Sequence, residues 1–269
     1  MSLQSFSQFA HGLLLLLSAI FSHSVVAQDS RWIDLTYDLS ADSVFWPTAE
    51  PFKLTTDAKG VTEAGYYYSA YSFTAAEHVG TPIDAPVHFA EGKYSVNEIP
   101  LGQLIGPAVL IDVAGPVRAN RDYLVSIDDI IDWGKANGPI PGRSIVPFRT
   151  EFGSLWPNAE RYLGTSLRGV DGVAALSFPG LSAEAATWLI ENRRINAVVI
   201  DTASIDFGKS RVFAAHVALM THNVPVFENL ANLQQLPATG IYVVALPIKI
   251  RGGSGGPLRI IATMNDSVR

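Results

Sequence analysis

Strand-type and helix-type hydrophobic patterns alternate along the chain, and this feature limits the possible folds most. Apolar, β-branched runs of strand length occupy residues 108–113, 197–200 and 241–250. Amphipathic helices are predicted after Ser126 and after Ser182, because serine is a favoured N-cap and apolar residues then recur at helical spacing. Since the strand at 197–200 closely follows the second helix, the sequence predicts an α/β domain rather than a sandwich or a helical bundle.

Two further strands are predicted from alternating apolar residues, at 33–39 and at 66–74. The tyrosines of the second run are interpreted as ordinary strand residues; they are Tyr66, Tyr67, Tyr68 and Tyr71. In the first predicted helix four apolar residues are expected to share the buried face, namely Ile127, Ile130, Ile131 and Trp133.

The composition excludes two broad classes of protein. With 48% hydrophobic and 16% charged residues, the chain is too apolar for a disordered segment. With 25 acidic against 19 basic residues, a net charge of −6, it is too acidic for a typical nucleic-acid binder. No repeat or linker-like stretch is present, so we expect one domain over residues 28–269 and a small-molecule partner.

The first 27 residues contain no Lys, Arg, Asp or Glu. Their apolar stretch, residues 12–21, is too short to span a bilayer, and Val25 and Ala27 fit a signal-peptidase site. We therefore predict a signal peptide over residues 1–27 and a secreted or periplasmic protein, with an uncleaved anchor as the alternative because positive charge is scarce there. The chain has no cysteine, so only its core or a bound metal can stabilise it after export.

Side chains that could bind a metal or act in catalysis are most concentrated in residues 77–89, which hold two of the six histidines and an aspartate. Two prolines and a glycine exclude a regular helix there, and imidazole and carboxylate groups in such a loop can converge on a divalent cation. Taken alone, these residue types in a loop are more often surface or turn residues.

This segment nevertheless resembles a known signature. Residues 78–89 are similar to the H-x-G-T-H-x-D-A-P-x-H-F motif of the cyclase family, which includes bacterial kynurenine formamidases and isatin hydrolases. Further segments resemble the family in the same order, at residues 45–47, 178–182, 200–206, 228–230 and 246–257. The resemblance implies a metal-dependent hydrolase of aryl or cyclic amides, with a swivelling β/β/α-type single domain assembled as a dimer or larger oligomer.

Carried over position by position, the resemblance implies four metal ligands, which are His78, Asp84, His216 and Glu228. It also implies that His88 is the catalytic residue and that Trp46 contacts the substrate. The alternatives are purely structural roles: a hydrogen-bonded core histidine at 216, a capping carboxylate at 228, an orienting partner of Asp84 at position 88 and a core tryptophan at 46. We interpret His222 as a helix cap or surface residue.

Pro82 is the one departure, because the family usually has a metal-binding histidine at that position. Three outcomes are open: one ion held by Asp84, His216 and Glu228 with His78 nearby, a second ion bound weakly, or loss of hydrolysis with binding retained. A nitrogen and oxygen ligand set without sulfur suits Zn²⁺ or Mn²⁺, and we favour Zn²⁺.

The function favoured at this point is that of an arylformamidase, which converts N-formylkynurenine to kynurenine and formate. The alternatives are an isatin hydrolase-like lactam hydrolase and a non-catalytic ligand-binding homologue. Residues 252–256 are rich in glycine but lack a following Lys-Ser or Lys-Thr, so we expect a connection between strands rather than a phosphate loop. A serine hydrolase is not indicated, because no G-x-S-x-G motif occurs and Ser254 has no histidine nearby in sequence.

Overall fold

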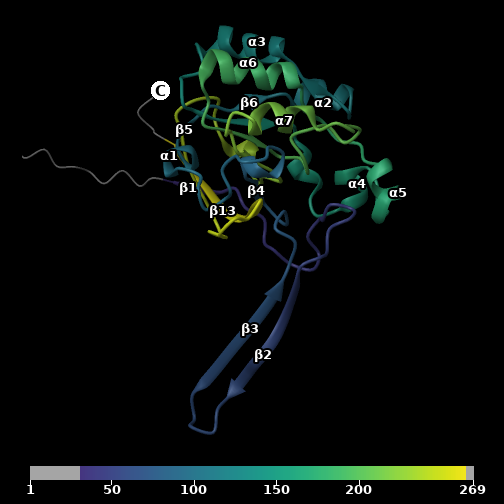
Figure 1. The fold of residues 1–269 in the computed structure, drawn as a ribbon, viewed down its shortest axis with the longest axis vertical. Coiled ribbons are helices and arrows are strands. Elements are labelled where there is room, and N and C mark those ends of the chain that lie inside the picture. Colours follow the sequence, from purple (N-terminus) through teal and green to yellow (C-terminus); the bar gives the residue numbers. More distant parts are fainter. Residues whose placement is uncertain (1–30, 265–269) are drawn as a thin grey trace, which may run out of the picture.

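A mixed sheet that closes on itself lies at the centre of the protein (Figure 1), as the computed structural model shows for residues 31–264. In hydrogen-bonded order its strands are β1 (Trp32–Asp34), β13 (Gly255–Met264), β12 (Ile241–Pro247), β5 (Ile105–Ala108), β8 (Ile145–Arg149), β10 (Ala197–Ile200), β11 (Val226–Phe227) and β4 (Pro82–Asp84). The short β6 (Ile111–Asp112) also pairs with β8. Because β13 pairs with β4 as well as with β12, the strands from β13 to β4 form a closed ring.

Four neighbouring strands of the ring, β5, β8, β10 and β11, are parallel, and the remaining pairs are antiparallel. The carboxyl ends of parallel strands meet at one edge of a sheet, where α/β proteins commonly bind ligands. Val199 on β10 is in register with Phe227 on β11. The residues that follow these two strands, Asp201 and Glu228, are therefore placed side by side at that edge.

Alternate residues of the central strands enter two different cores. On β10, Val198 and Ile200 belong to an outer core, whereas Ala197 and Val199 belong to a core inside the ring. The outer core lies between the sheet and three helices (Figure 1), which are α3 (Ile127–Asn137), α6 (Ala183–Arg193) and α7 (Ala214–Met220). Both faces of these strands are thus buried, which explains why their sequences are continuous apolar runs.

The other helices and strands are short. The helices are α1 (Leu101–Leu104), α2 (Ala114–Ala119), α4 (Ala159–Leu163) and α5 (Gly169–Ala174), and the 3₁₀ helices are η1 (Pro86–His88), η2 (Phe152–Leu155) and η3 (Leu233–Gln235). A separate parallel pair joins β7 (Leu124–Val125) to β9 (Gly180–Leu181). Within residues 31–264 no helix is both long and apolar enough to cross a membrane. The predicted signal peptide, residues 1–27, lies outside the described residues.

The predicted α/β class and both predicted helix starts are confirmed. Ser126 accepts a hydrogen bond from the Asp129 N–H at 3.3 Å, and Asp129 returns one by accepting from the Ser126 N–H, which completes a capping box at α3. Ser182 accepts from the Ala185 N–H at 3.1 Å and so caps α6. The buried face of α3 was predicted too broadly, because Ile131 points to solvent and is 38% exposed.

Several strand predictions need correction. The run at 33–39 forms a strand only as far as Asp34, the run at 108–113 is divided between β5 and β6, and the run at 241–250 ends at Pro247. Residues 66–74 do form a strand, β3 (Tyr67–Thr74), but it pairs only with β2 (Lys53–Val61). These two strands form an arm that projects from the rest of the protein (Figure 1), and nearly all residues of β3 are exposed.

Candidate metal centre and active site

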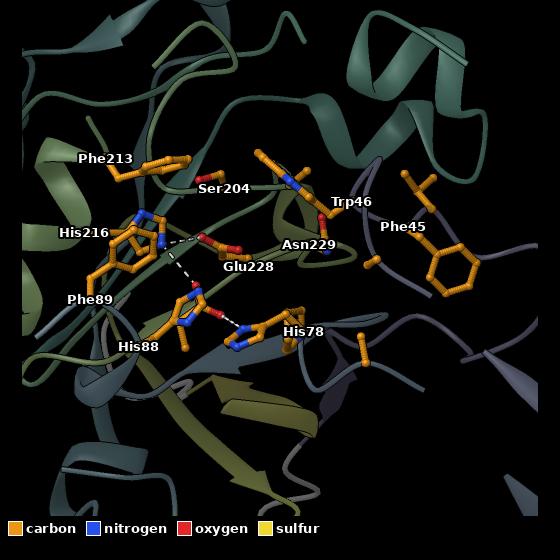
Figure 2. Close-up of a pocket in the computed structure, with 16 residues that line it drawn as sticks. Phe45, Trp46, His78, His88, Phe89, Ser204, Phe213, His216, Glu228 and Asn229 are labelled. Atoms are coloured by element: carbon orange, nitrogen blue, oxygen red, sulfur yellow. Dashed lines mark hydrogen bonds and ion pairs between the residues drawn. The ribbon is translucent and has the colours of Figure 1, made fainter. Parts of the chain in front are cut away.

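Three polar side chains converge where strands of the ring end (Figure 2). Asp84 is the last residue of β4, and Glu228 follows β11 directly. These strands pair with Asp84 opposite Val226, so the two carboxylates are brought together, and α7 adds His216. Each of the three offers a ligand atom within 4.8 Å of the other two, and all three residues are buried.

Asp206 holds His216 in one orientation. Its Oδ2 lies 2.6 Å from His216 Nδ1 and accepts the His216 backbone N–H, while its Oδ1 accepts the Ala215 N–H. The other ring nitrogen, Nε2, therefore points to Asp84 Oδ2 at 3.0 Å and to Glu228 Oε1 at 3.2 Å. A carboxylate that fixes the far nitrogen of an imidazole in this way is typical of metal-binding histidines.

Burial, neighbouring charges and hydrogen bonds together set the pKa values of this cluster. Burial and the nearby charge of Asp84 raise the pKa of Glu228 to about 7. Burial would also raise the pKa of Asp84, but His78 and His216 outweigh it and hold that pKa below its usual range. Burial opposes the charged form of His216, yet its hydrogen bonds to Asp206, Asp84 and Glu228 raise its pKa well above the usual value.

The residues present therefore fit a divalent cation. Two buried carboxylates face one imidazole, and their oxygen and nitrogen donors form a ligand set without sulfur. A cation in this position would compete with protons for Glu228 and His216 Nε2, because both groups have a raised pKa. The Ile205 N–H also donates to Glu228 Oε1 at 2.8 Å, which fixes the direction of that carboxylate.

A second group of side chains lies on the outer side of Asp84. His78 Nδ1 is 2.5 Å from Asp84 Oδ1, and His78 Nε2 is 3.0 Å from Ser254 Oγ. The Ser254 hydroxyl in turn lies 2.6 Å from the Glu77 carboxylate, to which it donates. Burial would lower the pKa of His78, but the charge of Asp84 outweighs this and raises it. Both ring nitrogens of His78 are thus engaged by protein groups.

His88 faces the pocket beside this group. Its ring stacks on that of His78 with centroids 4.1 Å apart, and His78, Asp84 and His88 offer a second set of convergent ligand atoms. Although the residue as a whole is exposed, partial desolvation of the ring and the neighbouring His78 and His216 lower its pKa to about 4. His88 is therefore neutral at pH 7 and able to accept a proton.

A pocket of about 330 Å³ opens above both groups. Aromatic side chains form much of its wall, with Trp46, Phe89 and Phe213 around the entrance to the carboxylates (Figure 2). Phe89 stacks on His216 at 4.5 Å, and Trp46 packs edge-on against Phe178. Within the described part of the chain, no Lys or Arg lines this pocket.

Pro82 is buried on β4 and also lines the pocket. Its carbonyl accepts the Glu228 N–H at 3.1 Å, so it helps to place that residue, but its ring has no donor for a cation. Of the six predicted site residues, the structure brings four around Asp84, and Trp46 lies across the same pocket; the four are His78, His88, His216 and Glu228.

Three contributors to the site were not predicted from sequence, namely Asp206, which orients His216, Asn229 and Ser254. Asn229 donates from Nδ2 to the Gly80 carbonyl and accepts from the Tyr162 hydroxyl, each at 2.8 Å, which ties the His78 loop to the strand ends.

Residues 248–254 connect β12 and β13, so the predicted connection at 252–256 is confirmed except that Gly255 and Gly256 already belong to β13. Ser254 ends this connection and reaches His78, and a Cβ at Gly255 would lie 2.5 Å from His78 Cε1. His222 lies just beyond α7 and is exposed, as predicted.

Comparison with known proteins places this geometry in context. A family model described as "Putative cyclase" matches residues 33–207. An isatin hydrolase of Roseibium aggregatum is 29% identical over 205 residues, which cover 74% of this chain and 76% of that protein. A kynurenine formamidase of Bacillus mycoides is 28% identical over 233 residues, which cover 86% of this chain and 97% of that protein.

Solved structures of isatin hydrolases are also similar to this chain. Isatin hydrolase A from Ralstonia solanacearum superimposes with a TM-score of 0.79 at 31% identity, covering 87% of this chain and 92% of that one. Isatin hydrolase A from Labrenzia aggregata, bound to benzyl benzoate, also has a TM-score of 0.79, at 30% identity, with 88% and 94% covered.

Proposed function

The chain belongs to the cyclase family, and from this premise we propose that it is a metal-dependent hydrolase that cleaves the C–N bond of uncharged aryl amides. Cyclic amides of the isatin type are the first candidates, and N-aryl formamides are the second. The observation that carries this proposal is an aromatic pocket that contains no cationic side chain and leads directly to a buried cluster of two carboxylates and a histidine.

Asp84, His216 and Glu228 are the residues that would hold the ion, with Zn²⁺ preferred over Mn²⁺. When bound, the ion would supply Lewis acidity, which would lower the pKa of a water molecule and polarise an amide carbonyl. Asp206 keeps His216 Nε2 directed at the two carboxylates. His78 holds the other oxygen of Asp84 through the contact at Nδ1, which restrains rotation of the carboxylate.

His88 is placed to move protons. It is neutral at pH 7 because its pKa is lowered to about 4, and its ring lies at the pocket beside Asp84 and His78. A neutral imidazole takes the proton released by the attacking water and returns it to the departing amide nitrogen. General acid–base catalysis of this kind contributes about 10²- to 10⁴-fold to a rate.

The pocket argues for an uncharged substrate. N-formylkynurenine carries an α-carboxylate and an α-ammonium group, and a buried carboxylate is costly unless a cation pairs with it. The pocket-lining residues in the described chain offer no Lys or Arg for that purpose. The faces of Trp46, Phe89 and Phe213 instead suit a flat aryl ring. This favours the isatin type over the N-formylkynurenine type that the motif alone suggests.

Three substrates test the proposal with the purified, metal-loaded protein. Isatin represents the cyclic amide, formanilide the uncharged aryl formamide, and N-formylkynurenine the charged one. We expect kcat/KM to be higher for both uncharged substrates than for N-formylkynurenine. A preference for N-formylkynurenine would contradict the pocket argument, and binding of all three without turnover would support a ligand-binding homologue instead.

Export remains a prediction from residues 1–27, and we propose a secreted or periplasmic location for the mature chain. Amino-terminal sequencing of the protein recovered from periplasmic and extracellular fractions tests this. A start near Gln28 is expected, whereas an intact amino terminus in the membrane fraction would support the uncleaved anchor.

A further inference from the structure

A tight turn carries one aromatic wall of the pocket. The Ala49 N–H donates to the Trp46 carbonyl at 2.9 Å, and Pro47 takes the second position of the turn, where its fixed φ is favoured. This turn and Phe45 before it, hereafter the Trp46 loop, contribute three residues to the pocket lining. Figure 2 shows Trp46 across the pocket from His216. The position of the Trp46 loop therefore sets the width of the pocket beside the candidate ion site.

Arg168 binds this loop through backbone carbonyls. Its Nη1 donates to the Trp46 carbonyl at 3.1 Å and to the Phe45 carbonyl at 3.5 Å. Its Nη2 donates to the Ala49 carbonyl. Arg168 lies 122 positions from Trp46 in sequence, so these contacts join two distant parts of the chain. Each of the three carbonyls belongs to a residue that lines the pocket, whereas Arg168 itself does not line it.

The start of α5 is shaped to fit the same loop. Gly169 has a φ of 71°, which glycine adopts without strain, and its N–H donates to the Pro47 carbonyl at 2.9 Å. A Cβ at Gly172 would lie 2.8 Å from Pro47 Cβ, so a larger residue there would push the loop away from the helix. Since Arg168 is the N-cap residue of α5, its side chain and the first turn of this helix hold the loop together.

A guanidinium group suits this task. It is planar and presents several N–H donors in fixed directions, so one side chain can bind several carbonyls at once. A charged donor also forms stronger hydrogen bonds than a neutral one. Because Arg168 is exposed, water competes for these bonds, and the loop depends on all three together rather than on any one of them.

We propose that Arg168 is a positioning residue for the substrate, which holds the Trp46 loop against α5 and so places the wall that contacts an aryl group. It acts through Trp46 rather than by touching the substrate. This inference rests on the proposed function, because it concerns how the same pocket binds its aryl amide. Loss of Arg168 loosens the wall but leaves the candidate ion ligands in place, so it should weaken binding more than the chemical step.

Arg121 offers a matched control. Like Arg168 it donates to three backbone carbonyls, but they belong to Arg161, Tyr162 and Ser177, none of which lines the pocket. The test compares Arg168→Ala with Arg121→Ala in the purified, metal-loaded protein. A third variant, Arg168→Lys, keeps the positive charge but has one nitrogen in place of the fork.

We expect Arg168→Ala to raise KM for isatin and formanilide by about 10-fold, while kcat and metal per chain stay within about 2-fold of wild type. Arg168→Lys should recover part of this loss, and Arg121→Ala should keep KM close to the wild-type value. A double-mutant cycle tests the route of the effect. In a Trp46→Ala background, Arg168→Ala should change KM by less than about 2-fold, because the wall it positions is already gone.

Hydrogen exchange gives a readout that needs no substrate. The Ala49 N–H is bonded within the turn, and the Gly169 N–H is bonded to it from α5. Both amides should therefore exchange faster in Arg168→Ala than in Arg121→Ala. Calorimetric melting of each variant separates this local loosening from a loss of stability of the whole fold, and titration calorimetry with isatin measures binding directly.

Two results would overturn the proposal. Equal changes of KM in Arg168→Ala and Arg121→Ala would show that Arg168 has no special role. An undiminished effect of Arg168→Ala in the Trp46→Ala background would show that it does not act through the aromatic wall. Failure of the proposed function looks different, because wild type would then neither hydrolyse nor bind the amides. Faster exchange at Ala49 in Arg168→Ala alone would in that case still show that the arginine holds the loop.

Discussion

The two groups of side chains that share Asp84 differ in burial and in chemistry. On the inner side, Glu228 and His216 are buried with Asp84, and two carboxylates face one imidazole. On the outer side, His78 and His88 are imidazoles at the pocket, where His88 is exposed. Asp84 thus joins a buried acidic cluster to a pair of imidazoles at the pocket.

This difference indicates separate roles. Buried carboxylates are costly unless positive charge compensates them, so the inner group is suited to an ion. Imidazoles in contact with the pocket can exchange protons with solvent and substrate, so the outer group is suited to proton transfer. The following experiments separate the two roles, in order of decreasing expected effect.

Asp84→Ala removes the residue that both groups share, and it should therefore abolish both functions. We expect metal per chain to fall to near zero and turnover to fall to the uncatalysed rate, measured by elemental analysis and by an amide hydrolysis assay. Asp132→Ala, which removes an exposed carboxylate from α3, is the control and should change neither. Metal retained at the wild-type level would contradict the inner group as the ion site.

His88→Ala affects only the outer group. Turnover should fall by about 10²- to 10⁴-fold, because a general acid–base is lost, while metal per chain stays constant. The same two measurements apply. If the variant instead loses its metal, His88 is a ligand rather than a proton carrier.

Asp206→Asn weakens the inner group without removing a ligand. Loss of the carboxylate that orients His216 should reduce metal affinity by about 10- to 100-fold, as measured by competition with a chelating dye. Asp201→Asn is a matched control, because Asp201 is also a buried carboxylate near the strand ends but accepts from Thr150 and Gly153 instead. Equal losses of affinity in both variants would argue against a specific role for Asp206.

The inner group also predicts how the effect of metal depends on pH. The pKa of Glu228 is raised from 4.5 to about 7, which means that the folded chain without metal favours the protonated carboxyl. The stability that this proton contributes to the metal-free fold is complete below pH 4.5 and is lost as the pH rises to about 7. Metal replaces the proton and favours the ionised form. The free energy by which Zn²⁺ stabilises the fold should therefore grow from pH 5 to pH 7, by about 1.4 kcal/mol per pH unit for each proton displaced, and it is followed as the increase in melting temperature on adding Zn²⁺. A constant increase over this range would show that no proton is displaced.

Pro82→His should have the smallest effect, which is a change in the outer group. A histidine there adds a donor beside His78 and Asp84, so metal per chain should rise when Zn²⁺ or Mn²⁺ is in excess. Loss of the rigid ring costs up to about 1 kcal/mol of stability through the unfolded chain. Calorimetry without metal and metal titration measure the two effects, and an unchanged stoichiometry would show that the outer group cannot hold an ion.

The sequence alone determined features that depend on neighbours along the chain. Ser126 and Ser182 predict helix starts because a cap bonds to a residue only three positions away. The motif around His78, Asp84 and His88 predicts a shared site because these residues lie in one short loop. The distant His216 and Glu228 were added only through resemblance to a family, since no local pattern connects them with residue 84.

Tertiary structure alone decided which groups satisfy these side chains. Ser254 lies 176 residues from His78 in sequence, and His216 lies 132 from Asp84, so neither contact leaves a periodic signal. The closed sheet decides the first contact, because pairing of β4 with β13 places Gly255 opposite Asp84 and so brings Ser254 to His78. The second contact depends on the placement of α7, which carries His216. Alternation likewise predicted a strand around Tyr67 and Tyr71 but not its exposure, since whether a face is buried depends on what the rest of the chain places against it.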